Sequence, residues 1–370
     1  MHRRRGSPIG YRRPWMACIV CAASGSAMAQ AGDGSTIYGR INVAVESTDL
    51  RPGATARMSR LSNYRSVVGF RGTEDLGDGL KALWQLEGAL SLDTGVGSFS
   101  NRDTRVGLSG PWGTAFAGVW TLPYTSATSS FDPFYPTTAG YMGLMGNGSA
   151  PTTDNVIDNS AFDRRQRNVV QYWSPQFRGL SARVAYAFNE ETVAATGARP
   201  SLLSLSLTAT SGEWLVTAAH EIHNRYHAAN GSDTGSKLGL AYSAGTVRLA
   251  GAVERLRYET AGGVLTRNAA YVSATWKAGA GTLQAGYAKA LDGHGSTTET
   301  VGFISNGEGT GATQWTVGGE YALSRRTALF VFYSRIANES GAAYDFAING
   351  TSPAMGQQPS VVAAGMRHSF

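Results

Sequence analysis

The sequence has few cysteines, few prolines and no long apolar run, and each shortage excludes a class of protein. Its two cysteines, Cys18 and Cys21, lie near the amino terminus, so the rest of the chain offers no disulfide, zinc–thiolate site or cysteine nucleophile. No stretch approaches the roughly eighteen apolar residues of a membrane-spanning helix. Proline is scarce (12 of 370 residues), whereas glycine reaches 47 and tyrosine 16, which is typical of many strands joined by tight turns.

Residues 1–29 have the layout of a secretory signal peptide. A basic start is followed by an apolar stretch from Trp15 to Ala23 and by small residues that end at Ala29, where we expect cleavage. A lipoprotein signal acylated at one of the cysteines is the alternative, but neither follows a Leu-small-small run. Removing this segment takes away five of the 32 Lys and Arg and none of the 26 Asp and Glu, so the net charge falls from +6 to +1 (27 − 26). This near-neutral balance gives no support for nucleic-acid binding.

Apolar and polar residues alternate with a period of two through residues 30–370. In TIYGRINVAV, for example, the apolar side chains Ile37, Ile41, Val43 and Val45 oppose Arg40 and Asn42. Such segments are about ten residues long, which suits a tilted membrane-crossing strand better than a strand of a soluble sandwich. We expect about sixteen strands that start near residues 36, 63, 80, 102, 113, 164, 179, 201, 213, 236, 246, 267, 281, 313, 327 and 359.

Short turns alternate with longer polar connections along the chain. The longer ones are expected near residues 46–56, 92–100, 121–160, 189–200, 224–235, 259–266, 291–312 and 337–358. Because lipid cannot satisfy backbone N–H and C=O groups, every strand must pair and the sheet must close. The pattern therefore predicts one all-β domain, a transmembrane antiparallel barrel with short turns at one rim and long loops at the other.

The longest connection, 121–160, differs from the others in composition. It carries aromatic residues, methionines and prolines in the stretch TLPYTSATSSFDPFYPTTAGYMGLMGNGSAPTTDN. An insertion of this length in a compact protein is usually functional, and its apolar content indicates packing against other parts of the chain. We expect it to fold into the barrel interior.

The stretch HEIHNRYH (220–227) superficially resembles a metal site. A zincin helix needs histidines four residues apart, but position 224 is Asn, and the flanking residues alternate like a strand, which puts His220 and His223 on opposite faces. No pairing of a nucleophile with a base is evident, so we expect neither a metal, a cofactor nor an enzyme. An outer-membrane barrel hydrolase and a secreted soluble β-protein remain the alternative classes.

Several stretches closely resemble the general diffusion porins of Gram-negative bacteria, in the form typical of β-proteobacteria. They are GFRGTEDLGDGLKALWQLEGALSLDTG (69–95), RVGLSGPWGTAFAG (105–118), NVVQYWSPQFRGLSARVAYAF (168–188), EYALSRRTALFVFYSRI (320–336) and the final GMRHSF. The resemblance implies a homotrimer of sixteen-stranded barrels in the outer membrane. It also implies that the third loop, 121–160, narrows each channel.

The resemblance assigns basic residues of the channel wall and acidic residues that oppose them. The family's wall cations match Arg40, Arg71, Arg105 and Arg165, and further candidates are Arg65, Arg102 and Arg167. Glu87 matches an acidic wall residue. The loop lacks the Pro-Glu-Phe-Gly stretch of enteric porins, so Asp132 in SFDPFYP is the nearest loop carboxylate.

The last strand ends directly on Phe370. Val362, Ala364, Met366, His368 and Phe370 share one face, which we expect to meet lipid, while Arg367 and Ser369 face the lumen. The strand is expected to pair with the first one and so close the barrel. In the family, the terminal Phe is also the signal read by the barrel-assembly machinery.

These observations predict a passive, water-filled porin of the outer membrane, in contact with lipid and lipopolysaccharide, that passes small hydrophilic solutes and ions. Because the assigned wall cations outnumber the loop carboxylates, we expect a mild preference for anions. A narrower, substrate-specific channel is the alternative.

Overall fold

Strands make up most of the residues that the structure describes. The computed structural model describes residues 34–51, 57–156, 159–194 and 196–370. Its sixteen long strands are β1 (Gly34–Arg51), β3 (Ser66–Gly77), β4 (Leu80–Ser91), β6 (Thr104–Gly110), β7 (Gly113–Thr121), β9 (Asp163–Trp173), β10 (Leu180–Ala187), β11 (Ser201–Ser211), β12 (Trp214–Asn224), β13 (Ser232–Ala244), β14 (Val247–Thr260), β15 (Gly263–Ala278), β16 (Gly281–Ala290), β18 (Ala312–Ala322), β19 (Thr327–Asn338) and β20 (Gln358–Ser369). The shorter elements are β2 (Met58–Asn63), β5 (Val96–Gly97), β8 (Ser149–Thr153), β17 (His294–Gly295), the helix α1 (Pro123–Thr128) and the 3-10 helices η1 (Ser129–Phe131) and η2 (Tyr141–Gly143).

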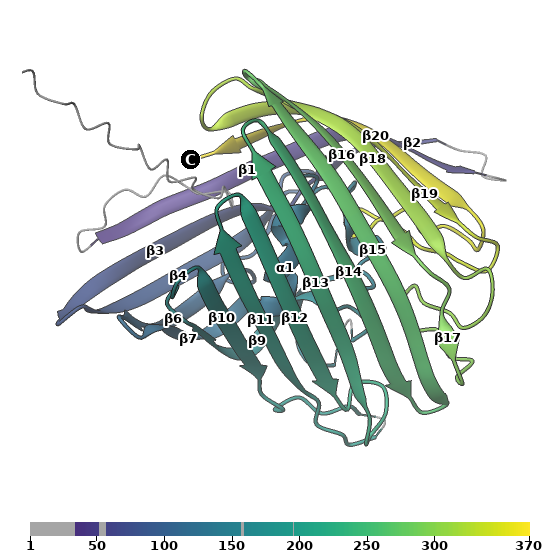
Figure 1. Cartoon of the computed structure of the whole chain (residues 1–370), viewed down its shortest axis with the longest axis horizontal. Coiled ribbons are helices and arrows are strands. Elements are labelled where there is room, and N and C mark those ends of the chain that lie inside the picture. Colours follow the sequence, from purple (N-terminus) through teal and green to yellow (C-terminus); the bar gives the residue numbers. More distant parts are fainter. Residues whose placement is uncertain (1–33, 52–56, 157–158, 195) are drawn as a thin grey trace, which may run out of the picture. The chain divides into compact units, whose positions relative to one another are not determined.

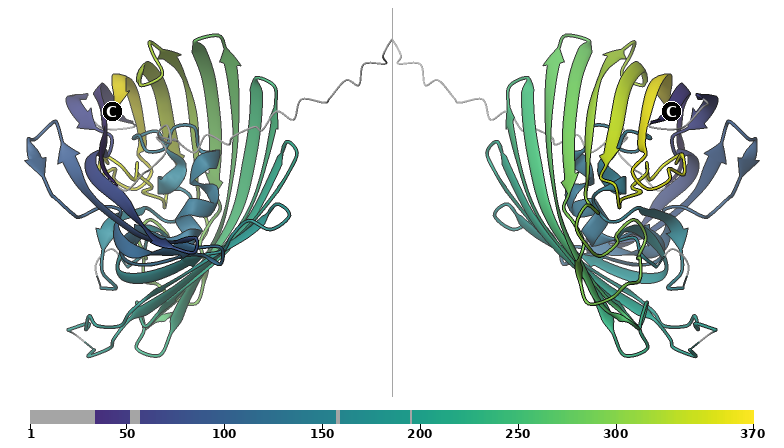
Figure 2. Two further views of the ribbon diagram at one scale, coloured as in Figure 1. Left: turned by 90° about the vertical axis from the view of Figure 1, so that its left-hand side faces the viewer. Right: turned by 90° about the vertical axis from the view of Figure 1, so that its right-hand side faces the viewer.

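The long strands form one closed antiparallel barrel (Figures 1 and 2). Each pairs with the next along the chain, and β1 pairs with β20 from Arg40↔Ser369 to Arg51↔Gln358. At the seam, the amides of Gly39 and Phe370 each donate to the other residue's carbonyl at 3.0 Å. The predicted closure of the last strand on the first is therefore confirmed, and it leaves no unpaired edge between them.

The strand starts agree with the predicted positions to within about four residues, but two connections are shorter than expected. The region 259–266 is a tight turn between Thr260 and Gly263, and in 224–235 the strands leave only residues 225–231 as the connection. The outward residues Glu259 and Thr266 are polar and were interpreted as loop. In the structure they belong to strand extensions beyond the apolar band, where side chains meet water while the backbone continues to pair.

The barrel is apolar outside and polar inside. Along β14, Leu249 and Val253 are exposed, whereas Ala252 and Glu254 are buried. The exposed side chains Trp112, Tyr172, Trp214, Trp276, Tyr321 and Phe370 lie near the short turns, and Tyr186, Phe188, Tyr287 and Trp315 lie nearer the long connections. Two such aromatic girdles bound the lipid-facing band of an outer-membrane barrel.

The predicted signal peptide, 1–29, lies outside the described residues. Among the described residues, no helix is long and apolar enough to cross a bilayer.

Candidate functional site

The connection from β7 to β9 crosses the interior of the barrel. We call its described residues, 122–156 and 159–162, the lumen segment. Its hydrogen bonds reach successive strands of the wall. The amide of Tyr124 donates to Ser204 Oγ on β11 at 3.0 Å. Further along the segment, the Phe131 carbonyl accepts from Ser273 Oγ on β15 at 2.6 Å, and the Ala139 carbonyl accepts from Gln314 on β18 at 3.1 Å. Figure 2 shows the short helices of this segment inside the ring of strands.

A cluster of four buried charges fixes the far end of the lumen segment. We call Asp163, Lys237, Glu254 and Arg267 the anchor cluster; their side chains are at most 1% exposed. Lys237 Nζ lies 2.6 Å from Asp163 and 3.5 Å from Glu254, and Arg267 lies 3.1 Å from Glu254. Two cations and two carboxylates balance, as burial requires.

The anchor cluster also holds the backbone of the lumen segment. Glu254 accepts hydrogen bonds from the Gly146 amide at 2.8 and 2.9 Å and from the Tyr124 hydroxyl at 3.1 Å, and Arg267 donates to the Leu144 carbonyl. The last long connection adds apolar contacts, because Tyr344 and Phe346 join a buried cluster with residues of the lumen segment. The segment is thus attached at several points along its length.

Five inward-pointing arginines on the opposite wall have no acidic partner among the residues that the structure describes. We call Arg40, Arg65, Arg71, Arg105 and Arg183 the arginine face; they lie on β1, β3, β6 and β10 or, for Arg65, in the bend before β3. Among the described residues, no carboxylate lies within 4 Å of any of these guanidiniums. Arg40 instead donates to the Arg65 carbonyl at 3.1 Å, and Arg65 donates to the Tyr135 hydroxyl at 3.1 Å and to Ser149 Oγ.

Aromatic rings support four of these guanidiniums, and Arg65 lies 5.5 Å from the ring centre of Tyr135. Arg71 lies 4.8 Å from the ring centre of Tyr38. Arg105 lies 4.2 Å from the ring centre of Trp120, 4.7 Å from that of Phe116 and 5.1 Å from that of Trp173. Arg183 also lies against Trp173, 4.5 Å from its ring centre. Ring faces attract a cation without neutralising it. The aromatic residues therefore hold the guanidiniums in place and leave their positive charge uncompensated.

Arg183 was not among the predicted site residues. It lies within the quoted stretch 168–188, on the β10 face opposite Val184 and Tyr186. An arginine on the non-lipid face of a membrane-crossing strand was the signal that could have identified it.

The other predicted cations are paired with carboxylates. Arg102 Nε lies 3.2 Å from Glu87 Oε1, Arg165 Nε lies 2.7 Å from Asp103 Oδ1, and Arg167 lies 3.5 Å from Asp154. Burial, aided by the nearby Arg165 and Arg65, lowers the pKa of Arg102 to about 10, so Arg102 stays charged at neutral pH. The prediction had not identified Asp103, which follows Arg102 directly in the chain.

The two predicted acidic residues do not face an open lumen. Glu87 is buried and accepts hydrogen bonds from Arg102 and, at 3.0 Å, from the Tyr38 hydroxyl. Asp132 is also buried and accepts from the amides of Phe134 and Tyr141 at 2.9 Å and from the Tyr271 hydroxyl at 3.1 Å. These contacts fold the lumen segment and tie it to β15, and that Asp132 opposes the wall cations stays a prediction.

Burial raises the pKa of Asp132 to about 6, although its hydrogen bonds to Tyr141, Phe134 and Tyr271 act in the opposite direction. For Asp103, burial likewise favours the neutral acid, but Arg165 and Arg102 outweigh it and hold the pKa below its usual value. Asp103 is therefore ionised and neutralises Arg165, which removes that arginine from the uncompensated set.

The histidine-rich stretch on β12 is structural. His223 is buried, stacks on Phe162 with ring centres 4.1 Å apart and bonds to Glu221 at 2.8 Å. His220 lies on the other face and bonds to Ser236 at 2.9 Å, as the alternation predicted. Among the described residues, no group of three or more His, Cys, Asp or Glu is placed to hold a metal ion.

A closed barrel with an apolar exterior, aromatic girdles and inward-facing charges is the architecture of an outer-membrane channel. The sequence profile of the Gram-negative porin family matches residues 16–341. The chain belongs to that family. It is an outer-membrane protein that forms a channel for the diffusion of small hydrophilic solutes and ions, and its relatives are channels rather than enzymes.

Individual relatives agree with this assignment. Outer membrane porin protein 32 of Delftia acidovorans is 29% identical over 290 residues, which cover 72% of this chain and 76% of that protein. Major outer membrane protein P.IB of Neisseria gonorrhoeae is 34% identical over 161 residues, or 41% of this chain and 42% of that protein.

Solved structures share the fold. An anion-selective porin from Comamonas acidovorans is similar with a TM-score of 0.75 and 24% identity, covering 92% of this chain and 100% of that one. The trimer form of OmpT from Vibrio cholerae has a TM-score of 0.64 and 16% identity, covering 91% of this chain and 99% of that one.

Proposed function

We propose that the channel prefers anions mildly and that the arginine face carries this preference. The observation behind the proposal is that the five arginines of the arginine face point inward with no carboxylate of the described chain within 4 Å. The other mapped wall cations, Arg102, Arg165 and Arg167, are neutralised. Solute entering the lumen therefore meets one wall with an excess of fixed positive charge. Screening over about 8 Å at physiological salt limits this field to the narrow zone.

In this proposal the lumen segment is the constriction. It extends from β7 to the anchor cluster and so reduces the free cross-section, and it leaves the arginine face as the wall along the remaining passage. Polar solutes cross together with their hydration water, so the width of this passage limits the size of the solute. The charge of its wall determines whether anions or cations pass more readily. Reconstitution in a planar bilayer under a KCl gradient tests the proposal. We expect stepwise increases in conductance and a reversal potential whose sign shows that chloride is more permeant than potassium. A reversal potential of the opposite sign would contradict the assigned role of the arginine face.

The assembly of the protein forms a second part of the proposal. Homotrimers are supported by the family and by the trimer form of the OmpT relative. The signal peptide 1–29 would direct export, and Phe370 would present the barrel to the assembly machinery from its place at the seam. Lipid and lipopolysaccharide would contact the apolar band.

A substrate-specific channel is the second candidate function. Both the lumen segment and the last long connection pack inside the barrel, where Tyr344 and Phe346 share a buried cluster with Tyr141 and Met142. Because two segments occupy the barrel interior, a narrow passage is favoured. Liposome swelling with neutral sugars of increasing size separates the two candidates: a gradual decline in rate supports a general porin, whereas uptake of one solute class alone supports the specific channel.

A further inference from the structure

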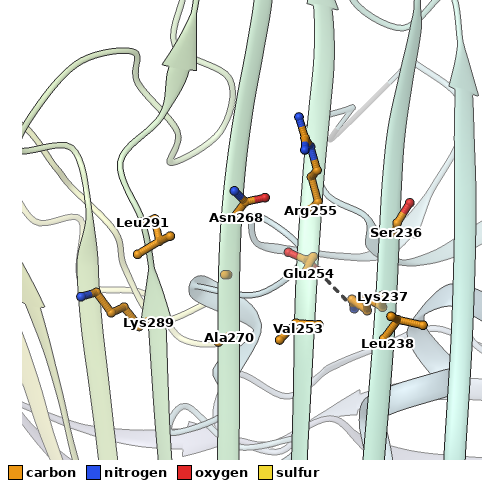
Figure 3. A pocket seen from close by; sticks show the side chains of 11 residues that line it. Ser236, Lys237, Leu238, Val253, Glu254, Arg255, Asn268, Ala270, Lys289 and Leu291 are labelled. Carbon is orange, nitrogen blue, oxygen red and sulfur yellow. Dashed lines mark ion pairs between the residues drawn. The ribbon is translucent and has the colours of Figure 1, made fainter.

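The lipid-facing side of the barrel carries a groove at the boundary between apolar and polar residues. It runs across the outer face of β13, β14, β15 and β16, with a volume of about 430 Å³ (Figure 3). Its apolar part is formed by Leu238, Val253, Ala270 and Leu291, of which Leu238 is 60% and Val253 54% exposed. Such exposure is normal where side chains meet acyl chains and is costly in water.

Two cations that pair with no acidic residue of the described ranges border this apolar part. Arg255 and Lys289 are both exposed on the outer face, and Asn268 lies between them, paired with Arg255 in the register of β14 and β15. No carboxylate in the described part of the chain lies within 4 Å of either cation. By contrast, the next outward arginine on β14, Arg257, pairs with Glu259 at 2.5 Å.

These cations lie near the outer boundary of the apolar band, within reach of lipid headgroups. Arg255 is eight residues beyond Val247, where β14 leaves its short turn. Eight residues span roughly 26 Å along a strand, or about 20 Å of height at the usual tilt, against an apolar band about 25 Å tall. On the neighbouring strand the outward residues also change from Leu238 to Ser236 at this level. The end with the longer connections is extracellular in such barrels, so the groove faces the outer leaflet.

We propose that this groove docks the phosphorylated, acylated glycolipid of the outer leaflet, lipopolysaccharide, through its lipid A portion. The phosphate would lie between Arg255 and Lys289, Asn268 would donate to its oxygens, and an acyl chain would follow Leu238, Val253 and Ala270. Cations beside lipid are stabilised by an anionic partner. Two cations that flank a polar side chain can bind a phosphate through charge-assisted hydrogen bonds. A second copy of the barrel fits less well, because a protein contact would have to bury both charges unpaired or supply carboxylates for them.

The proposal assigns a site to the lipid contact named above and is independent of ion preference. It is tested by native mass spectrometry of the full-length folded porin in detergent, with lipid A as the probe. We expect retained lipid A on the wild type and about tenfold weaker retention on the Arg255→Gln/Lys289→Gln double variant, as loss of two charge-assisted contacts implies. The matched control is Arg325→Gln/Arg326→Gln, which removes two exposed cations from a short turn at the opposite rim and is expected to bind like the wild type.

Two further lipids test which chemical group the groove binds, without substituting any residue. Dephosphorylated lipid A should bind the wild type about as weakly as lipid A binds the double variant, and phosphatidylglycerol should not replace lipid A. Equal retention of lipid A by the wild type and the double variant would overturn the proposal, as would an absence of lipid A binding. Equal binding of phosphatidylglycerol would assign the groove to a phospholipid instead. Loss of the oligomer in the double variant alone would assign it to a subunit contact.

Discussion

The arginine face and the anchor cluster are built from the same kinds of side chain but differ in how their charges are compensated. In the anchor cluster, Lys237 and Arg267 balance Asp163 and Glu254 at 2.6 to 3.5 Å, with side chains at most 1% exposed. On the arginine face, Arg71, Arg105 and Arg183 lie against aromatic rings and have no carboxylate within 4 Å among the described residues.

This difference separates a structural role from a functional one. A buried, balanced cluster presents no net charge to the lumen, but removing one member leaves the others uncompensated and costs much stability. A partly hydrated cation without a partner adds little to stability, yet its field reaches any ion that passes. Substitutions in the two regions should therefore affect different observables.

The largest expected effect follows Glu254→Ala. The substitution leaves Lys237 and Arg267 without their shared carboxylate and removes the acceptor for the Gly146 amide, so we expect a loss of about 3 to 5 kcal/mol. The lumen segment should also detach at this point and the open conductance should rise. Thermal unfolding in detergent and single-channel recording measure the two effects.

Glu259→Ala is the matched control, since it removes an outward carboxylate from the same strand. We expect it to leave conductance unchanged. If Glu254→Ala conducts and unfolds like this control, the anchor cluster does not hold the segment.

A smaller effect is expected from the protonation of Asp132, a buried carboxylate without a cationic partner. Burial raises its pKa from the usual 3.8 to about 6, so between these values the folded state binds a proton that the unfolded state does not. Stability linked to Asp132 therefore increases as the pH falls through 6. Relative to Asp132→Asn, the wild type should gain about 1.4 kcal/mol between pH 7 and pH 5. Unfolding midpoints of both proteins across this range provide the check, and a constant difference would exclude the linkage.

Glu87→Gln should convert a compensated cation into an uncompensated one. Arg102 would keep a hydrogen-bond acceptor but lose its counter-charge, so the anion preference should increase. One unit charge about 7 Å from a passing ion is worth roughly 0.6 kcal/mol in water, or about threefold in local ion concentration before screening. The reversal potential of the variant should accordingly lie closer to the equilibrium potential of chloride than that of the wild type. A shift in the other direction would show that Glu87 does not oppose Arg102.

The smallest effect is expected from Arg167→Gln. The Arg167 side chain is 44% exposed and lies 3.5 Å from Asp154, a geometry typical of surface pairs that contribute about 0 to 1 kcal/mol. We expect unfolding midpoint and ion preference to remain close to those of the wild type. A change as large as that of an arginine-face substitution would place Arg167 in the passage.

The sequence predicted the barrel well because strand signals are local. Side-chain alternation and turn residues mark each strand, so the sixteen starts and the closure at Phe370 could be located without knowing the partners. Strand ends were predicted less well, because outward polar residues such as Glu259 resemble a loop once the strand leaves lipid.

Compensation of charge could not be predicted in the same way, because it depends on contacts between distant segments. Arg165 and Arg105 look equivalent in the sequence, but only Arg165 meets a carboxylate, Asp103, 62 positions away. Asp132 was expected to oppose the wall cations, and its hydrogen bond with Tyr271, 139 positions away, was not predicted. These pairings follow from the path of the lumen segment, which no local pattern specifies.

The central claim is that the arginine face sets the ion preference, and the most direct measurement is the reversal potential of the Arg71→Gln/Arg105→Gln/Arg183→Gln variant beside the wild type under the same KCl gradient. We predict chloride preference in the wild type and a shift of the variant toward potassium, with unfolding midpoints that remain close. An unchanged reversal potential in a folded, conducting variant would contradict the account.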